Sequence, residues 1–222
     1  MIHRTVSFIV IAAFALAPAL LRPAPATAHP HVWVNASAVL TFDEARKFDN
    51  VTVRYALDEF TTAVLIEGLD KNANGVFERD ELKALAAENA EALAEFDWFV
   101  EVQAGAQRVA AKEVTGFDYS YEDEQMVLML QLALDRAIDP AAEDVTVRLY
   151  DPSFYVLVQL VEDAPLLVSG VDAEFCRVSV AAPSLDSSGV SLSDAALMNF
   201  DVSESIGRDY AERISLACGA GL

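Results

Sequence analysis

Twelve residues, from Asp70 to Glu81, place oxygen-bearing groups at the spacing of an EF-hand calcium loop. The first, third and fifth positions are Asp70, Asn72 and Asn74, and Gly75 stands where the chain must turn sharply. Later positions offer a backbone carbonyl, a ninth-position carboxylate and a bidentate glutamate. Calcium is a hard cation that prefers such an all-oxygen cage. The spacing predicts a Ca²⁺ site with the ligands Asp70, Asn72, Asn74, Val76, Glu78 and Glu81.

This ligand set predicts weak binding and a structural role for the ion. Two of the early ligands, Asn72 and Asn74, carry no charge. Fewer charges weaken binding, and extracellular modules of this kind bind calcium at roughly 0.1–1 mM. No second loop is present to pair with this one, so we expect an ion that joins two helices rather than a sensor. The alternative is a degenerate loop that keeps its shape without metal.

Two histidines close together, His29 and His31, form a second candidate metal site. Imidazole nitrogens suit zinc, copper and nickel, so these residues are candidate metal ligands, with Zn²⁺ as a possible ion. A closed structural zinc site usually has four ligands, and the carboxylates of Asp58, Glu59 or Asp151 are candidates to complete it. The alternative is a pair of exposed histidines at the chain end.

The two cysteines, Cys176 and Cys218, predict one disulfide, because an even count in an oxidising compartment favours pairing. The alternative is a thiolate metal site. Wide spacing without a nearby histidine makes that interpretation the weaker one.

The N-terminal 28 residues have the order of a secretory signal peptide: a basic start at Arg4, an apolar run and the small-residue triplet Ala26-Thr27-Ala28. We expect cleavage after Ala28, a periplasmic location and a soluble mature form. The alternative is a membrane anchor, but Pro18 interrupts the run and a spanning helix needs about 20 apolar residues. The net charge of −20 argues against nucleic-acid partners and favours cations.

Alternation of apolar residues from Val32 to Phe42 predicts a half-buried strand, followed by a second strand near Val51–Tyr55. Helices are expected at Glu59–Leu69 and Glu78–Phe96. Further strands are expected at Phe99–Val102, Gln125–Leu134, Val145–Tyr150, Tyr155–Val161 and Phe175–Val180. A Ser-rich linker begins at Pro183, and a helix is expected from Ser193 to Leu216.

These elements predict an α+β fold: a mainly antiparallel sheet with an inserted EF-hand-like helix-loop-helix and a C-terminal helical tail tied by the disulfide. The expected organisation is a signal peptide at 1–28, an α+β domain at 29–182 with its insert at 59–96, and a linker with a helical appendage at 183–222.

Several stretches together resemble a family of exported bacterial proteins with an uncharacterised domain, whose members are labelled as periplasmic components of ABC-type transport systems. The matching stretches are His29–Val34, Ala56–Phe60, Gly68–Leu82, Phe96–Phe99 and Tyr150–Val156. The late cysteine pair also fits. The resemblance implies a periplasmic accessory protein associated with permeases of the nickel/cobalt-exporter type and with zinc homeostasis.

The leading functional hypothesis is therefore an accessory protein for divalent-metal transport that binds zinc, or less readily nickel or cobalt. Its partner would be an inner-membrane divalent-metal permease. One alternative is a calcium-stabilised, non-catalytic interaction module. Another is a copper-dependent oxidase that uses the N-terminal His29. We expect no enzyme activity, because the mature chain has no histidine beyond His29 and His31 to serve a catalytic triad.

Overall fold

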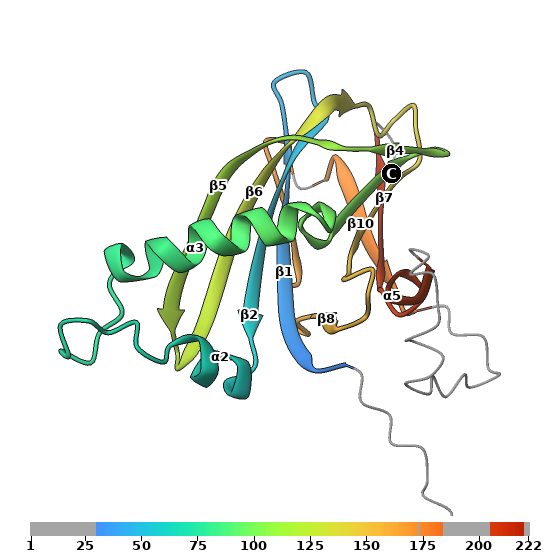
Figure 1. Cartoon of the computed structure of the whole chain (residues 1–222). Helices are drawn as coiled ribbons and strands as arrows, with labels where there is room; N and C mark the ends of the chain where they lie inside the picture. The colour runs from blue at the N-terminus through green and yellow to red at the C-terminus, as the bar shows by residue number, and fades with distance from the viewer. Residues whose placement is uncertain (1–29, 173, 184–204, 220–222) are drawn as a thin grey trace, which may run out of the picture. The chain divides into compact units, whose positions relative to one another are not determined.

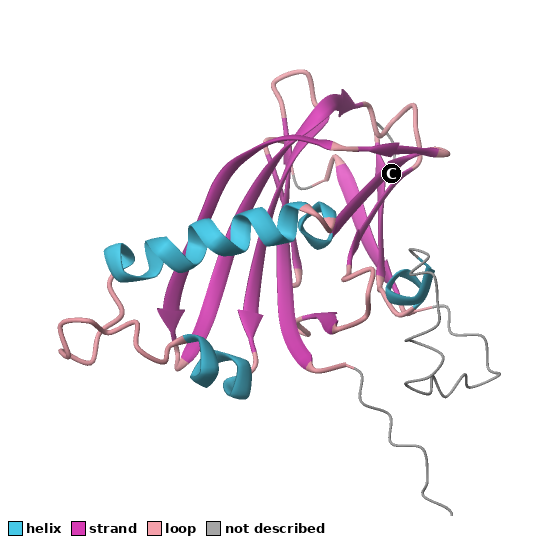
Figure 2. Cartoon of the chain, in the orientation of Figure 1, coloured by secondary structure: helices cyan, strands magenta, loops and turns pink. Residues whose placement is uncertain are grey.

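The structure is a computed structural model that describes residues 30–172, 174–183 and 205–219. Within these residues the chain forms two β-sheets, with two helices joined by a loop at one side of the first sheet (Figures 1 and 2). His29, the cleavage site and most of the predicted linker lie outside the described residues.

The first sheet has six strands in the described residues, in the order β5-β6-β2-β1-β8 with β9 also paired to β1. β1 lies inside the sheet, antiparallel to β2 on one side and parallel to β8 and β9 on the other. The strands are β1 (Val32–Phe42), β2 (Phe48–Leu57), β5 (Ala111–Glu122), β6 (Gln125–Ile138), β8 (Val156–Leu160) and β9 (Leu166–Ser169).

The second sheet has five strands within the described ranges, all antiparallel, in the order β10-β11-β7-β3-β4. These strands are β3 (Val100–Ala104), β4 (Gln107–Val109), β7 (Val145–Leu149), β10 (Cys176–Ala181) and β11 (Arg213–Cys218).

One hydrophobic core joins the two sheets and a helix. β1 buries every second residue, as its sequence predicted, and presents Val34, Leu40 and Phe42 to this core. The second sheet contributes alternate residues such as Val147 and Ile214. The helices are α2 (Glu59–Leu65), α3 (Arg79–Ala94), the short 3₁₀ helix η2 (Asp97–Phe99) and α5 (Ser205–Asp209). In Figure 1, α3 crosses in front of β5 and β6.

The C-terminal helix predicted from Ser193 to Leu216 is wrong over its last residues. Residues 193–204 lie outside the described part of the chain, and only Ser205–Asp209 form a helix, α5. From Arg213 the chain is strand β11, which pairs with both β10 and β7. The apolar residues of this segment alternate in burial, because Ile214 and Leu216 both enter the core.

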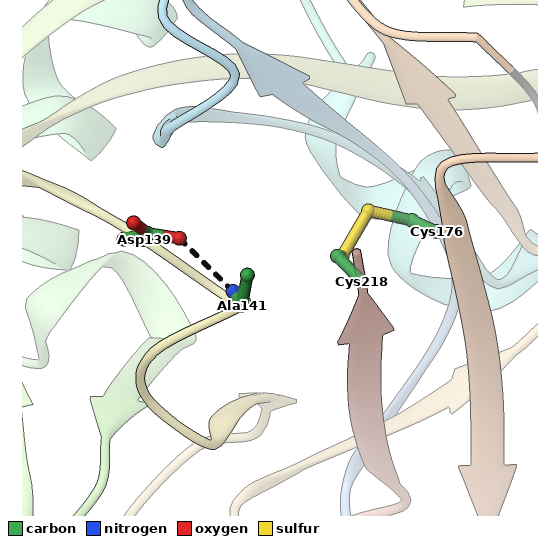
Figure 3. Close-up of a disulfide and its surroundings, with 4 residues drawn as sticks. All are labelled: Asp139, Ala141, Cys176 and Cys218. Atoms are coloured by element: carbon green, nitrogen blue, oxygen red, sulfur yellow. Dashed lines mark hydrogen bonds between the residues drawn. A yellow bond between two sulfur atoms is a disulfide. The ribbon is translucent and has the colours of Figure 1, made fainter. Parts of the chain in front are cut away.

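Cys176 and Cys218 form the predicted disulfide, with their sulfur atoms 2.05 Å apart. The two residues stand opposite each other in the register of β10 and β11, and this bond leaves no thiolate for the alternative metal site. Figure 3 shows it beside the turn in which the backbone N–H of Ala141 donates to Asp139 Oδ1 at 3.0 Å. The disulfide therefore fastens β11 to β10 at the end of the described chain.

None of the helices among the described residues has the length and apolar character needed to cross a membrane.

Candidate metal centre

The six predicted calcium ligands lie in and next to the connection between α2 and α3, so the helix ends set the position of the loop. α2 begins after Asp58, whose Oδ1 accepts a hydrogen bond from the backbone N–H of Thr61 at 2.8 Å. α3 begins after Glu78, which forms a capping box with Glu81. Both helices are shorter than predicted. α2 ends at Leu65 instead of Leu69. α3 spans Arg79–Ala94 instead of Glu78–Phe96.

The first half of the loop is folded around Asp70. Its Oδ1 accepts from the backbone N–H of Asn74 at 3.1 Å, and its Oδ2 accepts from that of Gly75 at 2.8 Å. The side-chain oxygen of Asn74 in turn accepts from the N–H of Val76 at 2.7 Å. Gly75 has a φ of 79°, a conformation that favours glycine. The sharp turn predicted at Gly75 is therefore present.

The second half of the loop is closed by two glutamates. Glu81 accepts from the backbone N–H of Lys71 at 2.8 Å through Oε1 and from that of Glu78 at 3.3 Å through Oε2. The side-chain amides of Asn72 and Asn74 donate to Glu78 at 3.2 and 2.6 Å. The hydrogen bond from Asn74 is the main cause that holds the pKa of Glu78 below its usual value. All five side-chain ligand candidates thus lie in one hydrogen-bonded network.

The donor chemistry of this loop fits calcium. Its three carboxylates and two amides supply oxygen ligands, and each oxygen that accepts an N–H keeps a second lone pair for an ion. However, no three His, Cys, Asp or Glu side chains in the described residues already converge on one point as a metal cage. If calcium bound, Asp70, Glu78 and Glu81 would supply its charged ligands.

The loop and α3 are anchored on the first sheet. Phe77, in the loop, packs its ring edge-on against Tyr121 of β5, with ring centroids 4.8 Å apart. Arg79 forms an ion pair with Asp118 of β5, and Leu82 is 1% exposed in the core. An ion in the loop would therefore stabilise the attachment of α3 to the sheet as well as the loop itself.

His31, the described member of the histidine pair, directly precedes β1. Its ring stacks on Tyr155 with the centroids 4.8 Å apart, and its backbone N–H donates to the carbonyl of Tyr155 at 2.9 Å. Its side chain is exposed. The structure thus places His31 beside the Tyr150–Val156 stretch, while His29 lies outside the described residues.

Two of the carboxylates suggested for the histidine site hold the backbone instead. Asp58 accepts from the backbone N–H groups of Trp33 and Thr61 at 2.9 and 2.8 Å. Burial acts to raise the pKa of Asp58, but these hydrogen bonds outweigh it and lower the pKa below its usual value. Asp151 is 3% exposed and accepts from the backbone N–H groups of Ser153 and Val156 at 2.8 and 2.9 Å. The third candidate, Glu59, is exposed in the first turn of α2.

The second sheet also contains a buried polar cluster that was not predicted from the sequence. Glu101 of β3 is 4% exposed, stands opposite Arg148 of β7 and also contacts Arg208 of α5. The sequence signal for this cluster is that Glu101, a charged residue, stands between the apolar Val100 and Val102. No local pattern links Glu101 to its two arginines, because they lie far along the chain.

Comparison with known proteins assigns most of the sequence to one family. Residues 14–218 match a family model described as "Protein of unknown function (DUF1007)". No curated protein matches the chain.

Proposed function

The chain belongs to the DUF1007 family of unknown function, and we propose that it is a calcium-stabilised, non-catalytic accessory protein for divalent-metal transport outside the cytoplasm. The observation that carries the proposal is the hydrogen-bonded loop from Asp70 to Glu81, which joins α2 to α3 and carries oxygen ligands at every position of the calcium motif. The match confirms the predicted uncharacterised-domain family. The periplasmic location and the permease partner belong to the proposal.

Two features support a location outside the cytoplasm. The first 28 residues have the composition of a cleavable signal peptide. The disulfide between Cys176 and Cys218 is of the kind that persists in oxidising compartments.

Calcium titration of the chain that begins at His29 tests the main proposal. We expect saturable binding by calorimetry with a Kd of about 0.1–1 mM. At a Kd of about 0.5 mM, about 10 mM Ca²⁺ would stabilise the fold by about 2 kcal/mol. For a chain of this size that corresponds to a rise in melting temperature of about 4–8 °C. Absence of both heat and stabilisation would overturn the calcium proposal.

Magnesium is the matched control ion. It is smaller than calcium and demands an octahedral cage with shorter bonds. We therefore expect a smaller shift of the melting temperature with Mg²⁺ than with Ca²⁺ at equal concentration. An equal shift would indicate general screening of the acidic surface rather than a calcium site.

The transport part of the proposal rests on the N-terminal histidines. The specific observation that favours it is the exposed side chain of His31 at the start of β1. We propose that His29 and His31 bind a transition metal, zinc before nickel or cobalt, and exchange it with an inner-membrane permease.

Replacement of His29 and His31 by Ala tests this exchange. The double variant should lose zinc affinity and impair growth under metal limitation, while calcium binding is unchanged because the calcium-motif residues are intact. If zinc affinity and growth are both unaffected, the protein is better described as a calcium-stabilised interaction module.

A further inference from the structure

The outer face of the second sheet gathers arginines from three elements. Arg148 of β7 and Arg213 of β11 occupy strand positions that alternate with core residues such as Val147 and Ile214, so they lie on the face opposite the core. Arg208 of α5 reaches the same face. These guanidinium groups stand close together although the chain as a whole is strongly acidic.

Glu101 holds two of these arginines in place. Its Oε1 accepts from Arg148 Nη1 at 3.2 Å and from Arg208 Nε at 3.0 Å. Its Oε2 accepts from Arg208 Nε at 3.1 Å and from the hydroxyl of Tyr150 at 3.0 Å. Arg208 Nη2 also donates to Gln103 at 3.3 Å. Each guanidinium has five N–H donors, so several donors of Arg148 and Arg208 have no acceptor among these contacts.

The charge balance of this cluster differs from that of the other ion pairs in the described residues. Elsewhere each paired arginine has its own carboxylate: Arg46 with Asp172, Arg54 with Glu122, Arg79 with Asp118, Arg108 with Asp97 and Arg136 with Glu143. Arg148 and Arg208 instead share Glu101. The side chain of Arg213 forms no ion pair within the described part of the chain. Positive charge therefore exceeds negative charge in this cluster.

A small pocket lies among these side chains, and we call it the arginine pocket. It has a volume of about 90 Å³ and is lined by Arg148, Arg208, Arg213, Asp209, Ala181, Ala182 and Ala211. The alanines leave space because their side chains are short. Burial, followed by the positive charge of Arg208, lowers the pKa of Arg148, while Glu101 acts in the opposite direction. Asp209 is exposed and forms no ion pair in the described residues.

We propose that the arginine pocket binds a small oxyanion, namely a carboxylate or phosphate group, between Arg148, Arg208 and Arg213. Planar guanidinium groups match both anions with paired hydrogen bonds. The volume admits a group of a few heavy atoms, so it would take a free anion or the charged end of a larger ligand. This site is independent of the proposed calcium loop, because no residue is shared between them.

Calorimetric titration with inorganic phosphate, and separately with acetate, at low salt in calcium-free buffer tests the proposal. At least one anion should bind saturably with a stoichiometry of one. Arg213→Gln should weaken that binding about tenfold, as expected for the loss of one charge-assisted hydrogen bond. Asp209→Asn should tighten it, because an acidic group leaves the lining. Response to only one of the two anions would identify the phosphate or the carboxylate as the preferred class.

Arg177→Gln is the matched control. Arg177 lies on β10, next to β11, is exposed and does not line the pocket. It should leave anion affinity within about twofold, since screening by salt limits the reach of exposed charges. The proposal is overturned if neither anion binds, or if Arg177→Gln weakens binding as much as Arg213→Gln. Arg213 is exposed, and an unchanged melting temperature of Arg213→Gln would show that the variant folds.

Discussion

The carboxylate of Glu81 accepts a hydrogen bond from the backbone N–H of Lys71 at 2.8 Å, which ties the end of the calcium-motif loop to its beginning. Glu81 also caps α3 as the third residue of that helix. One side chain therefore connects loop closure, helix initiation and the predicted bidentate ligand position.

Replacement of Glu81 by Gln should weaken calcium binding by at least about tenfold, because the variant loses the charged bidentate ligand. Calorimetric titration measures the change. Glu88→Gln is the control, since Glu88 is exposed on the same helix and lies outside the loop. Equal affinities of the two variants would remove Glu81 from the ligand set.

Asp58→Ala should destabilise the fold by about 1–2 kcal/mol at neutral pH, the usual cost of losing an N-cap. The variant loses the bonds from Thr61 and also the one from Trp33 that joins α2 to β1. Urea denaturation measures the difference in free energy of unfolding. Exposed Glu67, which follows α2, supplies the control variant Glu67→Ala, and we expect it to change stability much less.

The contribution of Asp58 should also depend on pH. Folding lowers the pKa of Asp58, so its stabilisation is present above the unfolded pKa of about 3.9 and is lost as the pH falls through the lower folded pKa. The stability difference between the original protein and Asp58→Ala should therefore be constant near neutrality and shrink below about pH 4. A difference that grows on acidification would contradict this assignment.

Glu101→Gln should destabilise the protein by about 3 kcal/mol, because it leaves the largely buried Arg148 without its counter-charge. Glu122→Gln removes a partner of Arg54 at an exposed site and should cost less than about 1 kcal/mol. Urea midpoints at an unchanged slope would measure both effects. Similar losses for the two variants would show that burial does not control the strength of these pairs.

Reduction of the Cys176–Cys218 disulfide should lower the free energy of unfolding by about 4 kcal/mol in the chain-entropy model. Denaturation with and without reductant measures this loss. The double variant Cys176→Ser and Cys218→Ser should resemble the reduced protein and respond no further to reductant. Persistent sensitivity of that variant would assign the effect to something other than this bond.

The sequence predicted those strands whose local pattern matches their burial. β1 was predicted because one face lies in the core and the other does not, so its apolar residues alternate. β5 was missed although it is long, because it forms the edge of its sheet, has register shifts near Val114 and Gly116, and fully buries only Tyr119. The alternation that identifies a half-buried strand is confined to its second half, where Phe117, Tyr119 and Tyr121 alternate with polar residues.

The C-terminal error and the arginine pocket have a common cause. Ile206, Tyr210 and Ile214 recur at helical spacing in the sequence, but β11 is a strand because β10 and β7 provide partners on both sides. Arg148 and Arg208 meet at Glu101 through the same long-range arrangement. By contrast, the residues of the calcium motif are local, so the sequence alone was enough to bring them together.

The position of β1 has a consequence for the order in which the protein folds. β1 is the first strand of the described residues, yet its parallel neighbours β8 and β9 follow only after residue 155, with Val32 paired to Val156. A nascent chain can form the β1–β2 hairpin early, but one edge of β1 keeps unpaired N–H and C=O groups until the C-terminal half arrives. Closure of so long a loop slows folding. The fold is thus completed late, after most of the polypeptide has been made.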